Sequence, residues 1–498
     1  MNLIILDLVR ADLSKIDISI FRKKDIKILA LTPLSFFYLE ENEIDFISFH
    51  TIISQEQFRE EVLKLYKKLF LERSFFSGIY REISQYLNIF LYREYIKGLI
   101  DSKNYNDIIY ITDRKIDKKL ELSNNCSFLY SQLNLNSVNS ISQRDLNIKL
   151  YNRYRFTTNI FKKIKNRILK RNLKYDWIDI LDKFPIKNNK IDLKIVDFSY
   201  KIDNFNFNLN FSIEKENYIN NYNTFLTKNN FFHVKEYKKN NKLYFFQHGS
   251  YLYKNLFIKY GEIELADINF VFNDYTKKVF KDLGAKKVYS VGSIVFNKKI
   301  KERKKEYDFL YIIQGHDYMG NLQYVDFSNS LHSFDGYELY QRHKGIIKLF
   351  GEKFKSKKII IRVHPLVLTS GLYVPFWELA KPYSNIVIDV SIPIHTLIEK
   401  SKYIISDYFT TEFINREIHY KRDIILFKGV PTPLPKETME DMKKMFILVD
   451  TVEDLEEKVK NIEEITKNRI RYDDIIEYYS SKKCYTKYVV NEILDKEL

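Results

Sequence analysis

Two apolar segments in the second half of the chain, residues 358–363 and 403–406, each end in side chains that can bind an anion. Short β-branched runs of this kind are typical of buried parallel strands, and open α/β sheets bind ligands beyond the carboxyl ends of their strands. Histidine, hydroxyl groups and the free N–H groups at a helix start all suit a phosphate. The residues that predict a phosphate or nucleotide site are His364, Pro365, Ser406, Asp407, Thr410 and Thr411.

Each of these two motifs also has a purely structural interpretation. His364-Pro365 can simply end a strand, although Arg362 lies two residues earlier and therefore on the same strand face as His364. Thr410 can cap a helix, with Glu412 in its first turn, without any ligand. The motifs favour a ligand site when taken together, because one sheet would bring both strand ends to the same crevice.

Two further strand-like runs end in residues that can do chemistry. Residues 242–246 lead into Gln247 and His248, and a strand-end histidine can serve as acid, base or structural residue. Residues 309–313 lead into a loop that a doubly wound domain often turns toward its ligand. We predict His248 and Asp407 as catalytic residues, with Gly249, Ser250, Gln314 and Gly315 beside the donor nucleotide.

Length, charge and cysteine content restrict the class of protein. A chain of 498 residues is too long for one hydrophobic core. Its net charge of +16 suits nucleic acid, an anionic membrane or a polyanionic substrate. Cys126 and Cys484 form no disulfide framework or metal-ligand spacing. Because no apolar run approaches the ~20 residues of a membrane span, we expect a cytoplasmic protein, soluble or peripheral on the inner membrane face.

The segment from Asn147 to Tyr175 carries many Lys and Arg residues and no acid. Within it, Ile160, Ile164 and Ile168 share one face of a predicted helix whose other faces are basic. Such a helix can lie on anionic lipid, or it can pack its apolar stripe on its own domain. Contact with an anionic membrane surface is therefore one expectation for this segment.

Strand-like and helical runs alternate along the chain, which predicts βαβ units and parallel sheets. Further expected strands are residues 3–8, 26–31, 108–112, 268–272, 287–291, 386–390 and 423–427, and the expected helices are residues 55–71, 79–99, 274–283, 337–350, 394–400 and 452–470. The pattern restarts after a basic connection at residues 298–305, so we expect two Rossmann-like domains. Eleven of the 13 glycines lie between Gly249 and Gly429, which assigns ligand handling to the second half. The predicted domains are residues 1–293, an acceptor domain, and 294–470, a donor domain, followed by a helical tail at 471–498.

Taken in order, these motifs resemble two-domain GT-B glycosyltransferases of bacterial surface polysaccharides, over about residues 242–427. The CDP-glycerol glycerophosphotransferases have an aromatic strand running into a His-Gly-Thr-like turn, an Arg-x-His strand, and a strand into Asp-Tyr-Ser-Ser. The counterparts here are Phe246-Gln247-His248-Gly249-Ser250, Arg362-Val363-His364 and Ser406-Asp407-Tyr408-Phe409-Thr410-Thr411. Sialyl- and Kdo-transferases with a His-Pro motif and a Ser/Thr motif are also similar, and His364-Pro365 fits them better.

The resemblance implies a metal-independent glycosyltransferase that uses a nucleotide sugar, with no further cofactor. It implies a CMP-activated nonulosonate or Kdo donor ahead of CDP-glycerol, and a glycan or lipid-linked glycan of capsule or lipopolysaccharide as acceptor. The histidine and hydroxyls of that family hold the donor phosphate, which assigns this role to His364, Thr410 and Thr411. A UDP-sugar epimerase on the same fold and a non-catalytic RNA-binding protein remain the alternatives, and the sequence leaves the catalytic base open.

Overall fold

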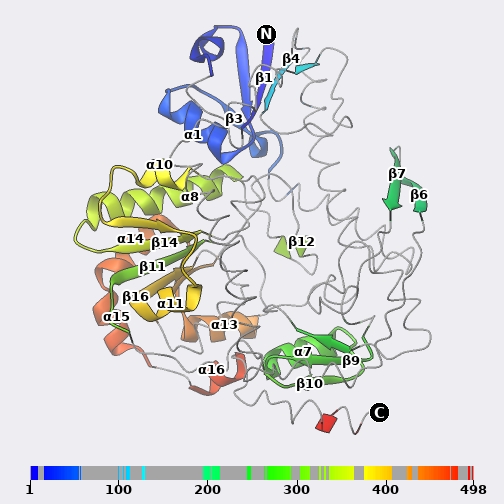
Figure 1. Cartoon of the computed structure of the whole chain (residues 1–498), viewed down its shortest axis with the longest axis vertical. Helices are drawn as coiled ribbons and strands as arrows, with labels where there is room; N and C mark the ends of the chain where they lie inside the picture. Colours follow the sequence, from blue (N-terminus) through cyan, green and yellow to red (C-terminus); the bar gives the residue numbers. More distant parts are fainter. Residues whose placement is uncertain are drawn as a thin grey trace, which may run out of the picture.

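The computed structural model describes the parts of the chain that form its sheets and the helices packed on them (Figure 1). The described residues are 2–8, 16–54, 57, 99, 105, 108–112, 126–128, 195–202, 205–212, 244–247, 263, 266–292, 303–313, 325–326, 330–331, 336–363, 375–406, 423–428, 436–470, 473–479, 492–493 and 496.

The first half contains a five-stranded parallel sheet in the order β3-β2-β1-β4-β5. Its central strand is an apolar run that is almost wholly buried, as a strand covered on both faces requires. The α-helix that follows β2 begins with Pro33 in its first turn and is capped by the Thr32 hydroxyl. The elements are β1 (Asn2–Asp7), η2 (Ile18–Arg22), β2 (Ile26–Ala30), α1 (Pro33–Glu41), β3 (Ile47–Ser48), η3 (Phe49–Thr51), β4 (Ile108–Thr112) and β5 (Cys126–Phe128).

The second half contains a six-stranded parallel sheet in the order β15-β14-β11-β16-β17-β18. Alternate residues of β11 enter two separate cores, Phe309 and Tyr311 on one face and Leu310 and Ile312 on the other. The strands are β11 (Tyr307–Ile313), β14 (Ile359–Val363), β15 (Ile386–Asp389), β16 (Ser401–Ser406), β17 (Ile424–Phe427) and β18 (Ile447–Val449). The helices are α8 (Gly336–Lys348), which continues as a π-helical turn (Leu349–Lys353), α10 (Phe376–Ala380), α11 (Ile394–Lys400), α13 (Lys436–Met445), α14 (Val452–Lys460) and α15 (Ile462–Asn468).

Both sheets are doubly wound. In the first, the chain adds β2 and β3 on one side of β1 and then β4 and β5 on the other. In the second, β14 and β15 lie on one side of β11, and β16, β17 and β18 lie on the other. The predicted α/β class with two Rossmann-like units is confirmed, while the domain boundaries at 293 and 470 stay a prediction.

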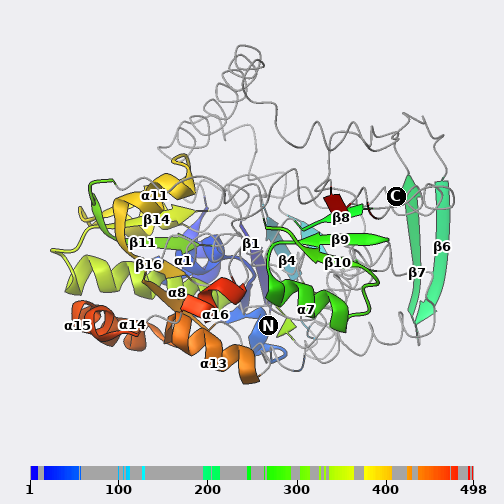
Figure 2. The ribbon, with the colours of Figure 1, turned by 90° about the horizontal axis from the view of Figure 1, so that it is seen from below.

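A three-stranded parallel sheet, β10-β9-β8, completes the first half (Figure 2). It comprises β8 (Tyr244–Phe246), β9 (Ile268–Val271), α7 (Asp274–Asp282) and β10 (Val288–Ser290). Two antiparallel pairs are separate from the parallel sheets: β6 (Ile195–Ile202) with β7 (Phe205–Ser212), and β12 (Val325–Asp326) with β13 (Ser330–Leu331).

Most predicted elements agree with the structure to within two residues, and the exceptions have physical causes. The single helix expected at 452–470 is two, because the chain breaks at Asn461 between α14 and α15. The elements α1, α10, α13 and β18 were not predicted, nor was the antiparallel pair of β6 and β7. The helices expected at 55–71 and 79–99 lie almost entirely outside the described residues, as does the basic segment 147–175.

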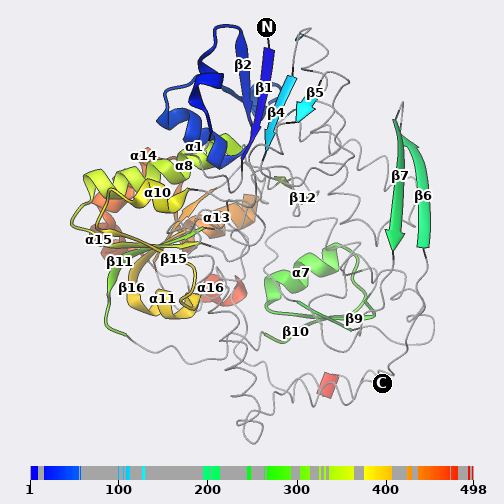
Figure 3. The ribbon, with the colours of Figure 1, turned by 45° about the horizontal axis from the view of Figure 1, so that its top comes forward.

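Among the described residues, two groups of contacts join the halves. The first lies where α1 packs against α8 (Figure 3) and is centred on a carboxylate of α1. Glu40 accepts hydrogen bonds from the hydroxyls of Tyr337 and Tyr340, each at 3.0 Å, and from the Lys344 ammonium at 2.7 Å. The Gln341 amide donates to the same carboxylate. These four donors lie on one face of α8, at helical spacing. We call the five residues the Glu40 seam.

The second contact is the tyrosine seam, formed by Asn273, Tyr275, Thr438 and Tyr479. Asn273 caps α7 by accepting from the Thr276 N–H at 2.8 Å, and its side-chain amide donates to the Tyr479 carbonyl at 2.6 Å. The Tyr275 and Thr438 hydroxyls are 3.2 Å apart, and the Tyr275 and Tyr479 rings are 4.5 Å apart. Tyr479 ends α16 (Asp473–Tyr479), which belongs to the predicted helical tail. This helix lies against both α7 and α13 (Figure 2).

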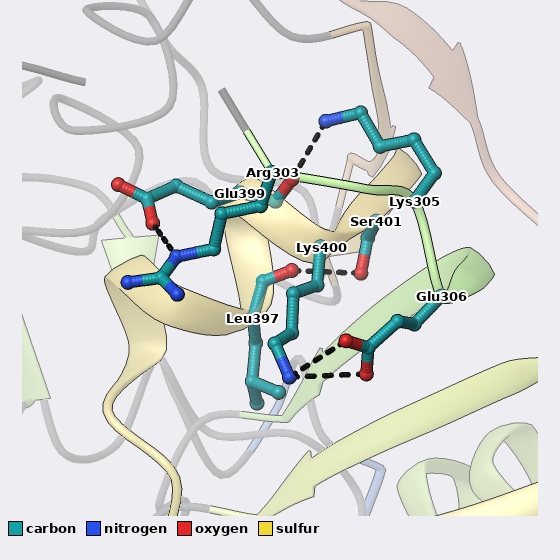
Figure 4. A network of polar contacts seen from close by, with 7 residues as sticks. All are labelled: Arg303, Lys305, Glu306, Leu397, Glu399, Lys400 and Ser401. Atoms are coloured by element: carbon teal, nitrogen blue, oxygen red, sulfur yellow. Dashed lines mark hydrogen bonds and ion pairs between the residues drawn. The ribbon is translucent and has the colours of Figure 1, made fainter. Parts of the chain in front are cut away.

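The connection that precedes β11 is fixed to the end of α11 (Figure 4). Arg303 pairs with the buried Glu399 carboxylate at 2.6 Å, and Lys305 donates to the Glu399 carbonyl at 2.7 Å. Cations at a helix C-terminus also complement its dipole. The sequence predicted an exposed connection here, and Arg303 is exposed, but both cations bind the second sheet's own helix.

Candidate active site

Three predicted site segments leave from adjacent strands of the second sheet. The strands β14, β11 and β16 are neighbours and parallel, so their carboxyl ends share one edge. In register, Ile313 lies beside Val363 and Ile312 beside Ser406. Along the chain, Gln314 follows Ile313, His364 follows Val363, and Asp407 follows Ser406. The pair β11 and β16 is also the topological switch point, where open α/β sheets bind their ligands.

Most predicted site residues lie outside the described residues, so their roles stay predictions. Ser406 is described: it ends β16 and is fully buried. The others are His248, Gly249, Ser250, Gln314, Gly315, His364, Pro365, Asp407, Thr410 and Thr411.

Arg362, expected beside His364 at a phosphate, contacts the end of the neighbouring strand. Its guanidinium is 3.7 Å from the Asp389 carboxylate and donates to the Val363 carbonyl at 3.2 Å. Asp389 in turn accepts from the backbone N–H groups of Ser391 and Ile392, at 3.1 and 2.9 Å. About nine-tenths of both charged side chains is buried. Arg362 therefore fixes the turn after β15 to the strand that leads into His364.

The strand before His248 is held by its last described residue. The Gln247 N–H donates to the Phe270 carbonyl at 2.9 Å, and its side-chain oxygen accepts from the Phe272 N–H at 2.7 Å. Phe272 lies just beyond the end of β9, so the buried Gln247 side chain takes the place of the strand carbonyl that would otherwise accept from the Phe272 N–H. His248 thus follows a fixed point at the carboxyl edge of the three-stranded sheet.

Asp7 is a further candidate site residue, which the sequence motifs did not indicate. It ends β1, is 4% exposed, and lies in register with Thr112 of β4, at the switch point of the first sheet. The next residue, Leu8, is held by the Ser35 hydroxyl, which accepts from its N–H at 3.0 Å. The available signal was the acid that ends the apolar run at the N-terminus, a strand-end position like that of Asp407.

Arg342 of α8 was also missed. Its guanidinium carbon is 5.0 Å from the centroid of the Phe427 ring, and Phe427 is the last residue of β17. Arg342 therefore brings a cation to the carboxyl edge that holds the predicted site. The sequence contained no signal for this, because only the fold brings residues 342 and 427 together.

Buried tyrosines away from the strand ends have shifted pKa values. Burial raises the pKa of Tyr275 to about 12. Burial and the Glu40 carboxylate raise the pKa of Tyr340, and burial likewise raises that of Tyr479. All three stay protonated at neutral pH, so each keeps its hydroxyl proton in the two seams. These shifts belong to packing rather than to the predicted site.

Within the described ranges, no group of three or more His, Cys, Asp or Glu side chains is placed to hold a metal ion. Nor does any helix in those ranges have the length and apolarity to cross a membrane.

No protein-family model and no curated protein sequence matches the chain. Among solved structures, it is similar to UDP-GlcNAc 2-epimerase from Neisseria meningitidis bound to UDP-GlcNAc, with 11% identity, 99% of this chain and 100% of that chain covered, and a TM-score of 0.34. The Methanocaldococcus jannaschii UDP-GlcNAc 2-epimerase gives 12% identity, the same coverage and a TM-score of 0.37. The pneumococcal O-GlcNAc transferase GtfA gives 12% identity over 52% of this chain and 54% of that chain, with a TM-score of 0.33. Likenesses this low say nothing about substrate.

Proposed function

We propose that this protein is a nucleotide-sugar-dependent glycosyltransferase of bacterial surface glycan synthesis. The observation that carries the proposal is the adjacency of β14, β11 and β16. Three segments rich in phosphate-binding residue types leave from neighbouring strand ends at a switch point. A crevice there takes a nucleotide, and fixed hydrogen-bond donors in it stabilise the charge of a leaving nucleotide.

In this proposal, His364, Thr410 and Thr411 bind the donor phosphate, with the backbone that follows Asp407. His248, after the strand end fixed by Gln247, acts as acid or base or orients the acceptor. The donor is a CMP-activated nonulosonate or Kdo sugar, which the His-Pro motif favours, and the acceptor is a glycan or lipid-linked glycan. Segment 147–175 is the proposed contact with an anionic membrane surface.

The first test is a thermal-shift panel of the whole protein with CMP, CDP, UDP, GDP and a short RNA. A ligand that binds only the native state stabilises it by about 2.7 kcal/mol at a hundred times its Kd. Stabilisation by CMP alone supports the nonulosonate or Kdo donor, and stabilisation by CDP supports glycerophosphate transfer. Stabilisation by UDP or GDP supports the nucleotide site but indicates a donor with a different nucleotide. A shift with RNA alone contradicts the proposal.

Two variants then separate binding from chemistry. His364→Ala should abolish binding of the nucleotide identified by the panel, because it removes a phosphate ligand. His248→Ala should keep nucleotide affinity and lose turnover. Retained affinity in the first variant removes the phosphate role of His364, and unchanged turnover in the second removes His248 from the chemistry. Release of free altered sugar without acceptor would identify an epimerase instead.

A further inference from the structure

A guanidinium group is held at the carboxyl edge of the second sheet by an aromatic ring. Arg342 lies in α8 between the buried residues Leu339 and Ile346, and is itself half-buried. Its guanidinium carbon stands 5.0 Å from the Phe427 ring centroid. Phe427 is fully buried, so the ring forms a fixed platform beneath the cation. Stacking on an aromatic face is a geometry that arginine favours, and the Nη1 atom of Arg342 is buried at this edge.

This cation lies beside the end of the strand that leads to the predicted phosphate residues. In register, Ser406 of β16 pairs with Leu426 of β17, so Phe427 is one residue beyond the end of β16. Neighbouring strands are about 4.8 Å apart. The ring under the Arg342 guanidinium is therefore one strand away from the point where the chain passes from Ser406 to Asp407. One bound nucleotide can span that separation. The switch point between β11 and β16 is at the same edge.

We propose that Arg342 binds the phosphate of the nucleotide donor; this inference rests on the proposed function. A planar guanidinium can donate two parallel hydrogen bonds to one phosphate, and it carries its charge at any physiological pH. The net charge of +16 indicated an anionic ligand without identifying the cation that meets it. Its position in the fold assigns that role to Arg342.

The test compares nucleotide with nucleoside binding by isothermal titration. The ligands are CMP and cytidine, and UDP and uridine, with the parent protein, Arg342→Gln and Lys348→Gln. Lys348 is the matched control, because it is an exposed cation of the same helix. If Arg342 binds the phosphate, Arg342→Gln should weaken nucleotide binding about 10- to 100-fold. Nucleoside binding should not change, and Lys348→Gln should match the parent protein.

The outcomes separate this inference from the proposed function. A parent protein that binds none of these nucleotides contradicts both. If folded Arg342→Gln binds nucleotide as tightly as the parent protein does, the role of Arg342 is contradicted and the proposed function is not. Equal losses for nucleotide and nucleoside also contradict it, since they indicate a structural role such as pairing with an acid of the segment after Ser406. If Arg342→Gln does not fold, Arg342→Lys is the second variant, because it keeps the positive charge and loses the planar group that donates two parallel hydrogen bonds. It should bind nucleotide about 3- to 10-fold more weakly, and unchanged affinity overturns the inference.

Discussion

The Glu40 seam and the tyrosine seam join the same two halves by different chemistry. In the Glu40 seam, one carboxylate receives donors from four side chains of α8, including the Lys344 ammonium. In the tyrosine seam, the Tyr275 and Tyr479 rings pack at a tilt, and α7 is joined to its neighbours by hydrogen bonds of neutral groups, while the Tyr479 hydroxyl donates to the Asp441 carboxylate of α13. Rings also pack at the Glu40 seam, where the centroid of the Phe36 ring lies 5.1 Å from that of Tyr337 and 5.8 Å from that of Tyr340. Its hydrogen bonds nevertheless converge on one carboxylate, whereas those of the tyrosine seam are spread over several groups. The two seams should therefore respond differently to single substitutions.

Their positions also differ in what they control. Tyr337 and Tyr340 are in the first turns of α8, directly after the connection that begins at the carboxyl end of β11. The Glu40 seam thus sets the start of the helix that carries Arg342. The tyrosine seam lies on the opposite face of the second sheet, against the core that contains Leu310 and Ile312. Loss of the first should disturb the predicted site more than loss of the second.

The largest effect is expected from Glu40→Gln. The change removes the charge that pairs with Lys344, and it puts an amide donor in place of one carboxylate oxygen that accepts from two side chains. The free energy of unfolding should therefore fall by about 2–4 kcal/mol. Urea unfolding of the whole protein measures this. Glu41→Gln, at the exposed neighbouring position, is the control and should change it by less than about 0.5 kcal/mol. Equal effects of the two changes would show that the carboxylate is not the centre of the seam.

Asn273→Ala should lower the free energy of unfolding by about 2 kcal/mol. It removes the cap of α7, worth about 1 kcal/mol, and the hydrogen bond to the Tyr479 carbonyl, worth a similar amount. Asn461→Ala is the comparison, because the exposed Asn461 side chain accepts no cap bond from α15 and donates only a 3.3 Å hydrogen bond to the Glu457 carbonyl. A loss as large as that of Glu40→Gln would mean that the tyrosine seam depends on one group after all.

Alkaline pH should weaken the tyrosine seam. The pKa of Tyr275 is about 12 in the folded protein, against an ordinary value of about 10 in the unfolded chain. Between these values the unfolded state binds fewer protons, so stability falls as pH rises, by about 1.4 kcal/mol per pH unit for this group. Urea unfolding at pH 8, 10 and 11 should show the loss, and Tyr275→Phe should reduce its slope. An unchanged slope in that variant would exclude Tyr275 as a source.

The smallest effect is expected from Lys278→Ala. Lys278 and Glu437 are 4.0 Å apart across α7 and α13, but both side chains are largely exposed. Such surface pairs contribute less than about 1 kcal/mol and are screened by salt. Urea unfolding should give a change below about 0.5 kcal/mol that vanishes in 0.5 M NaCl. A larger change would show that the tyrosine seam also depends on charge.

Several parts of the fold were predictable because their signal is local. The strand at 108–112 and the helix at 394–400 match β4 and α11 residue for residue, since a buried parallel strand is a continuous apolar run and a short helix has its own period. The order of motifs also predicted that strand ends 313, 363 and 406 share an edge, as β11, β14 and β16 do. The helix α13 was missed although it is longer than α11, because its apolar positions are methionines among charged residues. The strand β18 was missed because it has only three residues.

The sequence by itself determined the α/β class and the residue types at each strand end, because these follow from apolar runs and turn residues that are close together in the chain. Tertiary structure decided the strand order of each sheet. Tertiary structure alone decided which distant side chains meet. Glu40 meets Tyr340, Asn273 meets the backbone of Tyr479, and Arg342 meets Phe427, at separations that no local pattern encodes. The physical reason is that such contacts depend on helix packing over the whole sheet, and each is fixed only when both partners are buried together.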